Sequence, residues 1–386
     1  MGSTETPKTV KAIRYWGNKD LRYEEVPVVT ELKEGELRLA PSWCGICGTD
    51  VHEYSHGPFV SYGKESPHPL TGHYRPLIFG HEFSGTVTEV HPSVTTHKVG
   101  DKVAVEALIT DDTCEQCKLK RRNACDQTAF LGLSTGPGGF CEDIVIPAFI
   151  CHILPSHVGL DAGALVEPLS VAWHGVTQSG IQPGDSAIVF GAGPIGLAII
   201  LCLKARGIKK ILASEPSLAR HAQATKIGAI HAFNPITDDV VKGCKDLCDG
   251  LGPHYAFDAS GVQATLTTGL KAIRKYGIYY NIAVWVTQPT IDINELLYNG
   301  KTIKADLSFR PDDYHGVINA LSEGKITKQE VEDFITSRID MEDLEEKGIK
   351  ELMNNKDRHI KILVRVDKKQ PMVAESLLPP PSSIKL

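Results

Sequence analysis

Short apolar runs separated by turn-forming residues fill the first part of the chain. Residues 37–40, 85–90 and 102–105 form such runs, and Gly, Pro and Asp interrupt them. This pattern is typical of strands that are joined by turns. We therefore expect a β-rich first domain over residues 1–170.

From residue 182 the pattern changes to buried strands that alternate with helices. The expected strands are 186–190, 210–214, 255–260 and 277–283, and the expected helices are 194–206, 218–228 and 263–275. Alternation of this kind predicts an α/β fold, with a doubly wound parallel sheet of the Rossmann type over residues 171–307.

Near residue 306 the regular alternation of strands and helices ends, and the pattern of apolar and polar residues becomes mixed again. A helix at 314–324 and a charged helix precede a strand at 360–366, and we expect residues 308–366 to complete the first domain. The segment 367–386 is rich in proline and is predicted to be a disordered tail.

Composition narrows the class of protein. A length of 386 residues suggests about two or three domains. The net charge of -6 argues against nucleic acid as a partner, and no apolar run is long enough to span a membrane. Six of the ten cysteines lie in the first 150 residues, and four of these stand in Cys-x-x-Cys pairs. In a chain without a secretion signal this pattern favours metal binding over disulfides, and therefore a cytoplasmic protein.

A glycine-rich motif, Gly191-Ala192-Gly193-Pro194-Ile195-Gly196, follows a predicted strand and begins a predicted helix. Gly191 allows a tight turn, Gly193 lets a pyrophosphate approach the backbone, and Gly196 lets the helix pack closely on the strand. A tightly packed turn without a ligand is the alternative, but the strand and the helix favour a dinucleotide site.

The next predicted strand ends at Glu215, about 20 residues after the glycines, where a carboxylate can accept a hydrogen bond from the ribose 2′-OH. Its negative charge would repel the 2′-phosphate of NADP, so the sequence favours NAD. Arg220 follows within the next turns, where it could brace Glu215 or contact the adenosine ribose.

A thiolate, an imidazole and a carboxylate are available for a catalytic zinc with an open position. They come from the segment 44–52, which contains Cys44 and Cys47, and from Gly80-His81-Glu82. Glu167, before Pro168, is a further candidate ligand, although it could also merely cap a helix. A lone cysteine is more often a small core residue.

A second metal site is predicted where Cys114, Cys117 and Cys125 follow Asp111. Three thiolates and one carboxylate can close a tetrahedral structural zinc site. The alternative is a loop without metal that carries free thiols.

Taken together, these motifs resemble the zinc-dependent polyol branch of the medium-chain dehydrogenase/reductase superfamily, over essentially the whole chain to about residue 366. Within that branch the chain is most similar to the group that acts on 2,3-butanediol. The segments typical of that group are His68-Pro69-Leu70-Thr71-Gly72, Ser214-Glu215-Pro216-Ser217, Asn354-Asn355-Lys356-Asp357 and Lys361-Ile362-Leu363-Val364. The resemblance implies a GroES-like catalytic domain and a Rossmann domain with a cleft between them.

The resemblance also assigns roles to residues. It selects Cys47 rather than Cys44 as the thiolate ligand, with His81 and Glu167 completing the zinc site and Glu82 as an alternating or outer ligand. Asp111 takes a structural-zinc position that is cysteine in much of the superfamily.

Further roles concern the alcohol and the cofactor. Thr49 would contact the alcohol, His52 would pass its proton to solvent, and Arg310 would lie near the cofactor phosphates. The implied reaction interconverts a vicinal diol and an α-hydroxy ketone, with zinc stabilising the alkoxide and NAD accepting the hydride.

Two alternatives remain at this point. One is a dehydrogenase of sorbitol, xylitol or another polyol, and only the insert at residues 56–78 bears on that choice; its pattern favours the short diol. The other is a non-catalytic NAD-binding protein, which would have no use for the zinc and relay residues. The family forms dimers and tetramers, and a strand at 302–307 is placed to pair across a two-fold axis.

Overall fold

The computed structural model describes residues 8–372, which form two compact units. The first contains residues up to Glu167, together with 310–318 and 335–372, and the second contains Pro168–Phe309 and Asn319–Phe334. No helix of the described residues has both the length and the apolar character needed to cross a membrane.

The first unit is built on antiparallel strands. Its strands are β1 (Thr9–Gly17), β2 (Asp20–Pro27), β3 (Glu36–Gly45), β4 (Leu77–Ile78), β5 (Glu82–Val90), β6 (Lys102–Val105), β7 (Leu108–Ile109), β8 (Ala129–Phe130), β9 (Ile144–Pro147), β10 (Cys151–Ile153), β17 (Ile335–Asp340) and β18 (Lys361–Arg365). The main sheet has the order β10-β6-β5-β3-β18-β17, and β9 also pairs with β3. The late strand β18 therefore lies beside β3 in the main sheet of the first unit.

Short helices connect these strands. They are α1 (Gly48–His56), α2 (Glu115–Lys118), α3 (Leu160–Ala164) and α12 (Lys350–Asn355). Buried apolar residues from β1, β3, β5 and β18 form the core of this unit, with Leu39, Phe83 and Val364 among them.

The second unit confirms the predicted parallel sheet. Its strands are β11 (Ser186–Phe190), β12 (Lys210–Ser214), β13 (His231–Phe233), β14 (Tyr255–Asp258), β15 (Ile278–Asn281) and β16 (Thr302–Ala305). They pair in parallel in the order β13-β12-β11-β14-β15-β16, which is the order of two joined βαβαβ halves.

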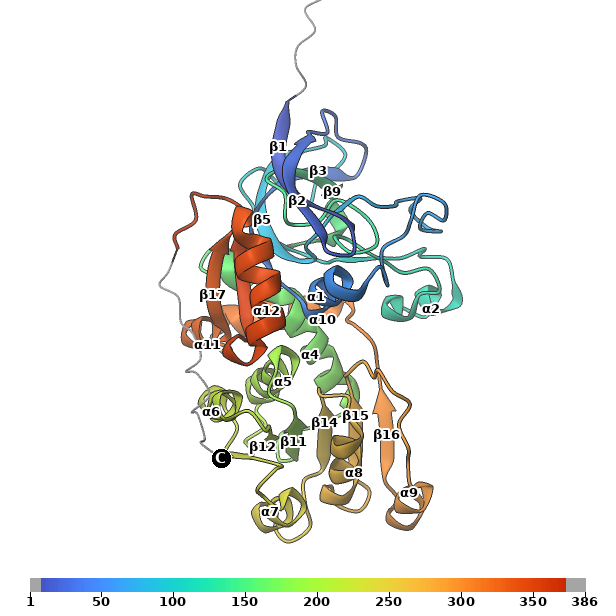
Figure 1. Cartoon of the computed structure of the whole chain (residues 1–386), viewed down its shortest axis with the longest axis vertical. Helices are drawn as coiled ribbons and strands as arrows, with labels where there is room; N and C mark the ends of the chain where they lie inside the picture. The colour runs from blue at the N-terminus through green and yellow to red at the C-terminus, as the bar shows by residue number, and fades with distance from the viewer. Residues whose placement is uncertain (1–7, 373–386) are drawn as a thin grey trace, which may run out of the picture. The chain divides into compact units, whose positions relative to one another are not determined.

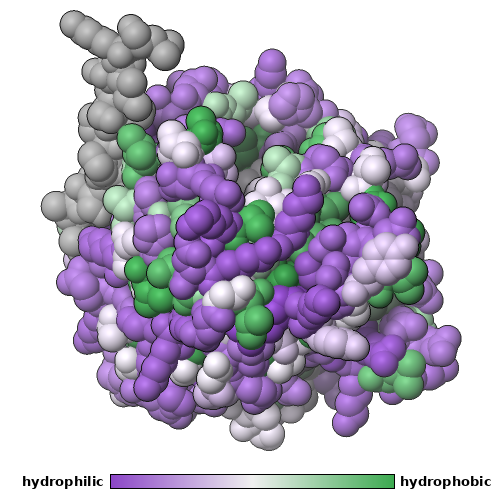
Figure 2. Space-filling view, turned by 90° about the horizontal axis from the view of Figure 1, so that it is seen from below, coloured by the Kyte–Doolittle hydropathy of each residue, from purple (hydrophilic) through white to green (hydrophobic). Residues whose placement is uncertain are grey.

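Helices surround these strands (Figure 1). They are α5 (Pro194–Ala205), α6 (Leu218–Ile227), α7 (Val240–Leu247), α8 (Gln263–Ala272), α9 (Ile293–Asn299) and α11 (Lys328–Phe334), and α4 (Val166–Ser179) and α10 (Pro311–Ser322) cross the unit boundaries. The view from below shows a mostly hydrophilic surface on which hydrophobic residues gather near the middle (Figure 2).

One boundary differs from the sequence-based expectation. Helix α11, expected in the first domain, groups with the second unit. Lys204 of α5 pairs with Glu330, and Lys226 of α6 pairs with Asp333 at 2.8 Å, so α11 is held by the helices of the parallel sheet.

The predicted tail is described only as far as Met372. The backbone N–H groups of Val366 and Asp367 donate to the Ser42 carbonyl oxygen at 3.0 and 3.4 Å, so the start of this segment is attached to β3. The rest of the predicted tail, residues 373–386, lies outside the described residues.

Candidate active site and metal centres

Two neighbouring strands bring the predicted zinc ligands together. In the antiparallel pair of β3 and β5, Gly45 lies opposite Glu82. Cys47 follows the end of β3 by two residues, and His81 precedes β5 by one, so the register places both beside Glu82. A Cβ on Gly45 would lie 2.2 Å from Glu82 Oε2, and this close approach therefore requires glycine.

Cys47, His81 and Glu82 offer one sulfur, one nitrogen and one oxygen atom that all lie within 4.8 Å of one another. This donor set suits zinc. Cys44 does not belong to the group. Burial raises the pKa of its thiol well above the ordinary value. Its sulfur contacts the carbonyl oxygen of Gly45 at 3.7 Å.

Asp50 lies behind His81. Its Oδ1 atom is 3.5 Å from His81 Nδ1, and its Oδ2 accepts a hydrogen bond from the Cys47 backbone N–H at 2.9 Å. Burial lowers the pKa of His81, whereas the charges of Asp50 and Cys47 raise it. The two residues together outweigh burial, so the pKa of His81 lies well above the ordinary value. Asp50 Oδ1 and His81 Nδ1 are buried without a hydrogen-bond partner. A carboxylate behind a histidine orients the ring when its other nitrogen binds a metal.

Glu82 faces a buried lysine from a distant part of the sequence. Lys361 Nζ donates to Glu82 Oε1 and Oε2 at 2.7 and 2.6 Å, and to the Ile46 carbonyl oxygen at 3.0 Å. Both side chains are 2% exposed. Lys361 therefore neutralises Glu82 and engages both of its oxygen atoms.

Glu167 lies in the first turn of α4 and is buried. Burial raises the pKa of its carboxyl group to about 7, and the charge of His81 partly offsets this effect. The structure does not include Glu167 in the three-donor group. Its charge nevertheless acts on the same residues, since Glu82 and Lys361 also shift its pKa.

The two predicted relay residues both belong to α1. The Cys47 thiol lies 3.6 Å from the Thr49 hydroxyl oxygen, which places this hydroxyl next to the donor group. The His52 side chain is exposed, and its ring centroid lies 6.5 Å from that of His56. An exposed imidazole one turn from Thr49 can exchange protons with solvent.

The glycine motif forms the turn between β11 and α5. Gly191 has φ +87°, and a Cβ on Gly196 would lie 1.8 Å from the Gly191 carbonyl oxygen. Pro194 and Ile195 form the first turn of α5, with Pro194 at its first position. The turn therefore has the close packing that a pyrophosphate-binding loop requires.

Glu215 follows β12 and fixes this turn. Its Oε2 accepts from the Ala192 backbone N–H at 2.7 Å, and its Oε1 accepts from the Ser217 N–H at 2.9 Å. Arg220 lies beside the same loop, since its Nη1 is 3.9 Å from where a Cβ on Gly193 would stand. Arg310, by contrast, belongs to the first unit, and its Nε donates to Asn123 Oδ1 at 3.0 Å. Its expected position near cofactor phosphates stays a prediction.

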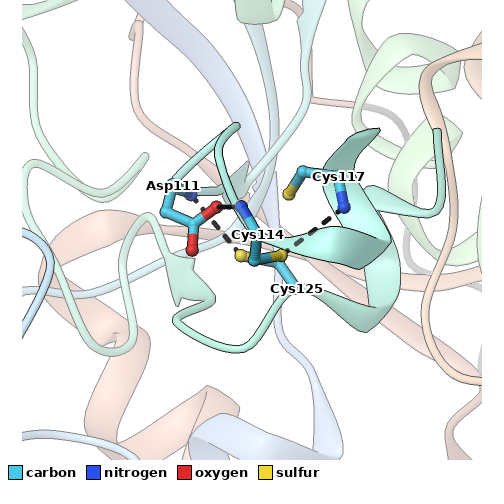
Figure 3. A group of neighbouring side chains, drawn as sticks. All are labelled: Asp111, Cys114, Cys117 and Cys125. Carbon is cyan, nitrogen blue, oxygen red and sulfur yellow. Dashed lines mark hydrogen bonds between the residues drawn. The ribbon is translucent and has the colours of Figure 1, made fainter. Parts of the chain in front are cut away.

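The second predicted metal site is also assembled. Asp111, Cys114, Cys117 and Cys125 offer atoms within 4.8 Å of one another, and their side chains converge in Figure 3. Asp111 Oδ1 accepts from the Cys114 N–H at 2.9 Å, while Cys125 Sγ accepts from the Asp111 N–H at 3.5 Å.

These hydrogen bonds shift the pKa values of the group. The N–H groups of Cys114 and Thr113 lower the pKa of Asp111 to about 2, so its carboxylate is charged. Burial, together with hydrogen bonds to the other thiols, raises the pKa of Cys117 to about 12. One charged oxygen and three crowded thiols suit a thiophilic cation such as zinc.

Sequence reasoning missed two residues of the site. Asp50 stands three residues after Cys47, at a helix position where an acid commonly caps the backbone, and this spacing could have drawn attention to it. Lys361 was noted only as part of a group-specific segment, and no local signal connects it to Glu82, which lies 279 residues away.

Comparison with known proteins gives a consistent result. Residues 33–156 match the model of the alcohol dehydrogenase GroES-like domain, and residues 194–323 match that of the zinc-binding dehydrogenases. An (R,R)-butanediol dehydrogenase of Saccharomyces cerevisiae is 36% identical over 92% of this chain and 98% of its own length. A D-xylulose reductase A of Aspergillus niger is 32% identical over 87% of this chain and 94% of its own length.

Among solved structures, the 2R,3R-butanediol dehydrogenase of Bacillus subtilis superposes with a TM-score of 0.86. It is 35% identical and covers 93% of this chain and 100% of its own. Similarity at this level extends across both units rather than one motif. The chain belongs to the family of zinc-binding alcohol dehydrogenases with a GroES-like domain.

Proposed function

We propose that this protein is an NAD-dependent dehydrogenase that interconverts 2,3-butanediol and acetoin at a catalytic zinc. The observation that carries the proposal is the three-donor group of Cys47, His81 and Glu82, in a chain that also contains the glycine-rich turn. The butanediol dehydrogenases of yeast and Bacillus subtilis support the choice of substrate.

Cys47 and His81 would hold the zinc with one of the two glutamates. Lys361 already engages both oxygen atoms of Glu82. Glu167 is buried with a raised pKa, so a nearby cation would relieve the cost of its charge. We therefore assign Glu167 as the third ligand at rest and Glu82 as the outer or alternating one. His81 Nδ1 faces Asp50 Oδ1 at 3.5 Å, which leaves its other ring nitrogen to bind the metal.

When bound, zinc supplies Lewis-acid activation of the alcohol and the nicotinamide supplies the hydride acceptor. The protein provides the proton path. Thr49 would accept the proton of the substrate hydroxyl group as it gives up its own, and the exposed His52 on the same helix would pass a proton to solvent. Asp50 holds His81 in the orientation that ligation needs.

The cofactor assignment favours NAD over NADP. Glu215 places a negative charge directly after β12, beside the turn that Gly191 begins. A 2′-phosphate would meet this charge, whereas a ribose hydroxyl group can donate to it. Arg220 beside Gly193 would contact the adenosine side of the cofactor, and we retain Arg310 as a candidate contact to its phosphates.

Asp111, Cys114, Cys117 and Cys125 would hold a structural zinc. All four donors are already assembled, and backbone N–H groups already donate to three of them. We expect weaker binding than at a site with four cysteines, because a carboxylate is a harder ligand than a thiolate.

A sugar-alcohol dehydrogenase is the second candidate, and the Aspergillus D-xylulose reductase supports it. The zinc and cofactor residues do not separate the two, so substrate comparison must decide. We also propose a cytoplasmic location, because the paired cysteines converge in donor groups that favour metal binding over disulfides.

We also propose a homodimer, or a homotetramer built from such dimers. Among the described residues 8–372, β16 is the end strand of the parallel sheet and pairs only with β15. Exposed apolar side chains accompany this edge, namely Val284, Val286, Ile293, Leu297, Tyr298 and Leu307. A second copy is the partner that a sheet edge accepts most directly.

Replacing the thiolate ligand tests the catalytic assignment. Cys47→Ala should abolish NADH formation and remove the zinc of the catalytic site, while the zinc of the Asp111 site is retained. Metal analysis of dialysed enzyme, with Cys151→Ala as a matched control, gives the result. An active variant that has lost no zinc would contradict the proposal.

A further inference from the structure

Glu53 is a buried carboxylate that the proposed chemistry does not use. It lies on α1, the helix that carries Thr49 and His52, and is 1% exposed. A carboxylate at such a position is unfavourable unless hydrogen bonds replace the lost water. Its partners therefore indicate what this residue does.

The partners all belong to one short segment that follows α1. Glu53 Oε2 accepts from the N–H groups of Phe59 and Val60 at 2.8 and 3.1 Å. Glu53 Oε1 accepts from the Ser61 N–H at 2.9 Å and from the Ser61 hydroxyl at 2.5 Å. A hydrogen bond to a carboxylate is stronger than one between two neutral groups. The four hydrogen bonds to Glu53 therefore fix the backbone of residues 59–61.

Helix geometry places this anchor close to Thr49. Thr49 and Glu53 are four residues apart, so they lie on one face of α1, separated by about 6 Å along its axis. Helical side chains lean toward the N-terminus, which directs the Glu53 carboxylate toward the turn of Thr49. The Thr49 hydroxyl is itself 3.6 Å from the Cys47 sulfur.

The anchored segment carries an apolar side chain. Phe59 is 70% exposed, although its backbone is held by the buried carboxylate. The Phe59 N–H lies 2.8 Å from the Glu53 carboxylate, and Glu53 stands one helical turn from Thr49, so the Phe59 ring is within reach of an alcohol held at Thr49.

We infer that Glu53 is a positioning residue, which holds the Phe59–Ser61 segment beside the substrate and thereby sets the choice between a short diol and a sugar alcohol. The inference rests on the proposed function, because it takes Thr49 as the group that contacts the alcohol. An apolar wall accepts the methyl groups of butanediol. It leaves the additional hydroxyl groups of xylitol without partners, which is costly.

Glu53→Gln tests this role with almost no change of size. The amide nitrogen would face backbone N–H groups, donor against donor, and release part of the segment. The ratio of kcat/KM for (2R,3R)-butanediol to that for xylitol should fall by about 10-fold or more, mainly through KM for the diol. Zinc content should not change. Glu65→Gln, the same substitution at an exposed position of the same insert, should leave the ratio unchanged.

Two further variants keep the test decisive if Glu53→Gln does not fold. Ser61→Ala removes one of the four hydrogen bonds, and Phe59→Ala removes the apolar ring; both should lower the same ratio. An unchanged ratio in both, or equal losses for the two substrates in Glu53→Gln, overturns the inference. If the wild-type enzyme does not oxidise butanediol, the proposed function fails instead. Glu53 is then tested on the ratio of any two alcohols that the enzyme does oxidise.

Discussion

At the residue scale, the most consequential contact is the buried pair of Lys361 and Glu82. Burial lowers the pKa of Lys361, but Glu82 and Cys47 raise it above the ordinary value, so the ammonium form is retained. The pair gives Glu82 a counter-ion that does not depend on zinc. This leaves Glu167 as the carboxylate that depends most on the metal for its charge.

Removing the lysine should leave Glu82 as an unpaired buried charge. We expect Lys361→Met to lower the free energy of unfolding by about 3–5 kcal/mol, measured by urea denaturation of the metal-free protein. Lys361→Arg should retain most of the stability. The double variant with Glu82→Gln should recover part of the loss, and a Lys361→Met enzyme as stable as wild type would contradict the role given to this pair.

Glu167 predicts a pH dependence of the metal-free protein. Its carboxyl pKa rises from an ordinary value of 4.5 to about 7, so folding favours the neutral form. The stability from this group is complete below pH 4.5 and is lost as the pH rises through 7, a loss of about 3 kcal/mol.

Urea denaturation of the metal-free protein at several pH values tests this expectation. The Glu167→Gln variant cannot ionise at this position, so it should not show the loss of stability that Glu167 causes. The difference in the free energy of unfolding between wild type and variant should therefore change progressively from pH 4.5 to 7. Parallel curves for the two proteins would show that Glu167 is not buried as a neutral acid.

Residue identities could be predicted from the sequence better than their partners. The Asp111 group follows from local spacing, whereas Cys47 was chosen over Cys44 from the family resemblance; the structure brings the members of each set together. Lys361 could not be found in this way, because only the pairing of β18 with β3 brings it to Glu82. The four hydrogen bonds of Glu53 could not be predicted from the sequence either, because they depend on how the insert folds back onto α1.

At the scale of elements, regular patterns were predicted well and charged segments poorly. The central parallel strands β11 and β12 are almost wholly buried, so their apolar runs stand out from the flanking helices. Helix α10 begins at Pro311, three residues before its predicted start, because proline suits the first helical position. The strand β17 was missed, although its residues are nearly all buried, because Arg338 and Asp340 interrupt its apolar pattern.

The edge of β16 yields a prediction about assembly. Thr302 donates its N–H to the Gly277 carbonyl oxygen, so alternation directs the N–H of Ala305 away from β15. Ala305→Pro removes this outward donor and should convert the dimer to a monomer in light scattering. Lys304→Ala, on the same strand, should stay dimeric. A dimeric Ala305→Pro protein, or a monomeric wild type, would exclude pairing through this edge.

At the scale of the whole molecule, the chain divides its chemistry between two units that each have their own core. The first unit contains both donor groups and the helix α1 with Thr49 and His52, and the second contains the glycine-rich turn with Glu215. This division follows from the fold, since an antiparallel sheet brings loops from distant sequence positions together, whereas a parallel sheet builds a nucleotide site from consecutive elements.

The most direct test of the central claim is NADH formation from (2R,3R)-butanediol, xylitol and sorbitol. Each substrate is measured on the native enzyme, after chelation and after zinc is restored. The account predicts the highest kcat/KM for butanediol, with activity lost on chelation and recovered with zinc. Preference for a sugar alcohol would contradict the substrate assignment, and full activity without zinc would contradict the mechanism.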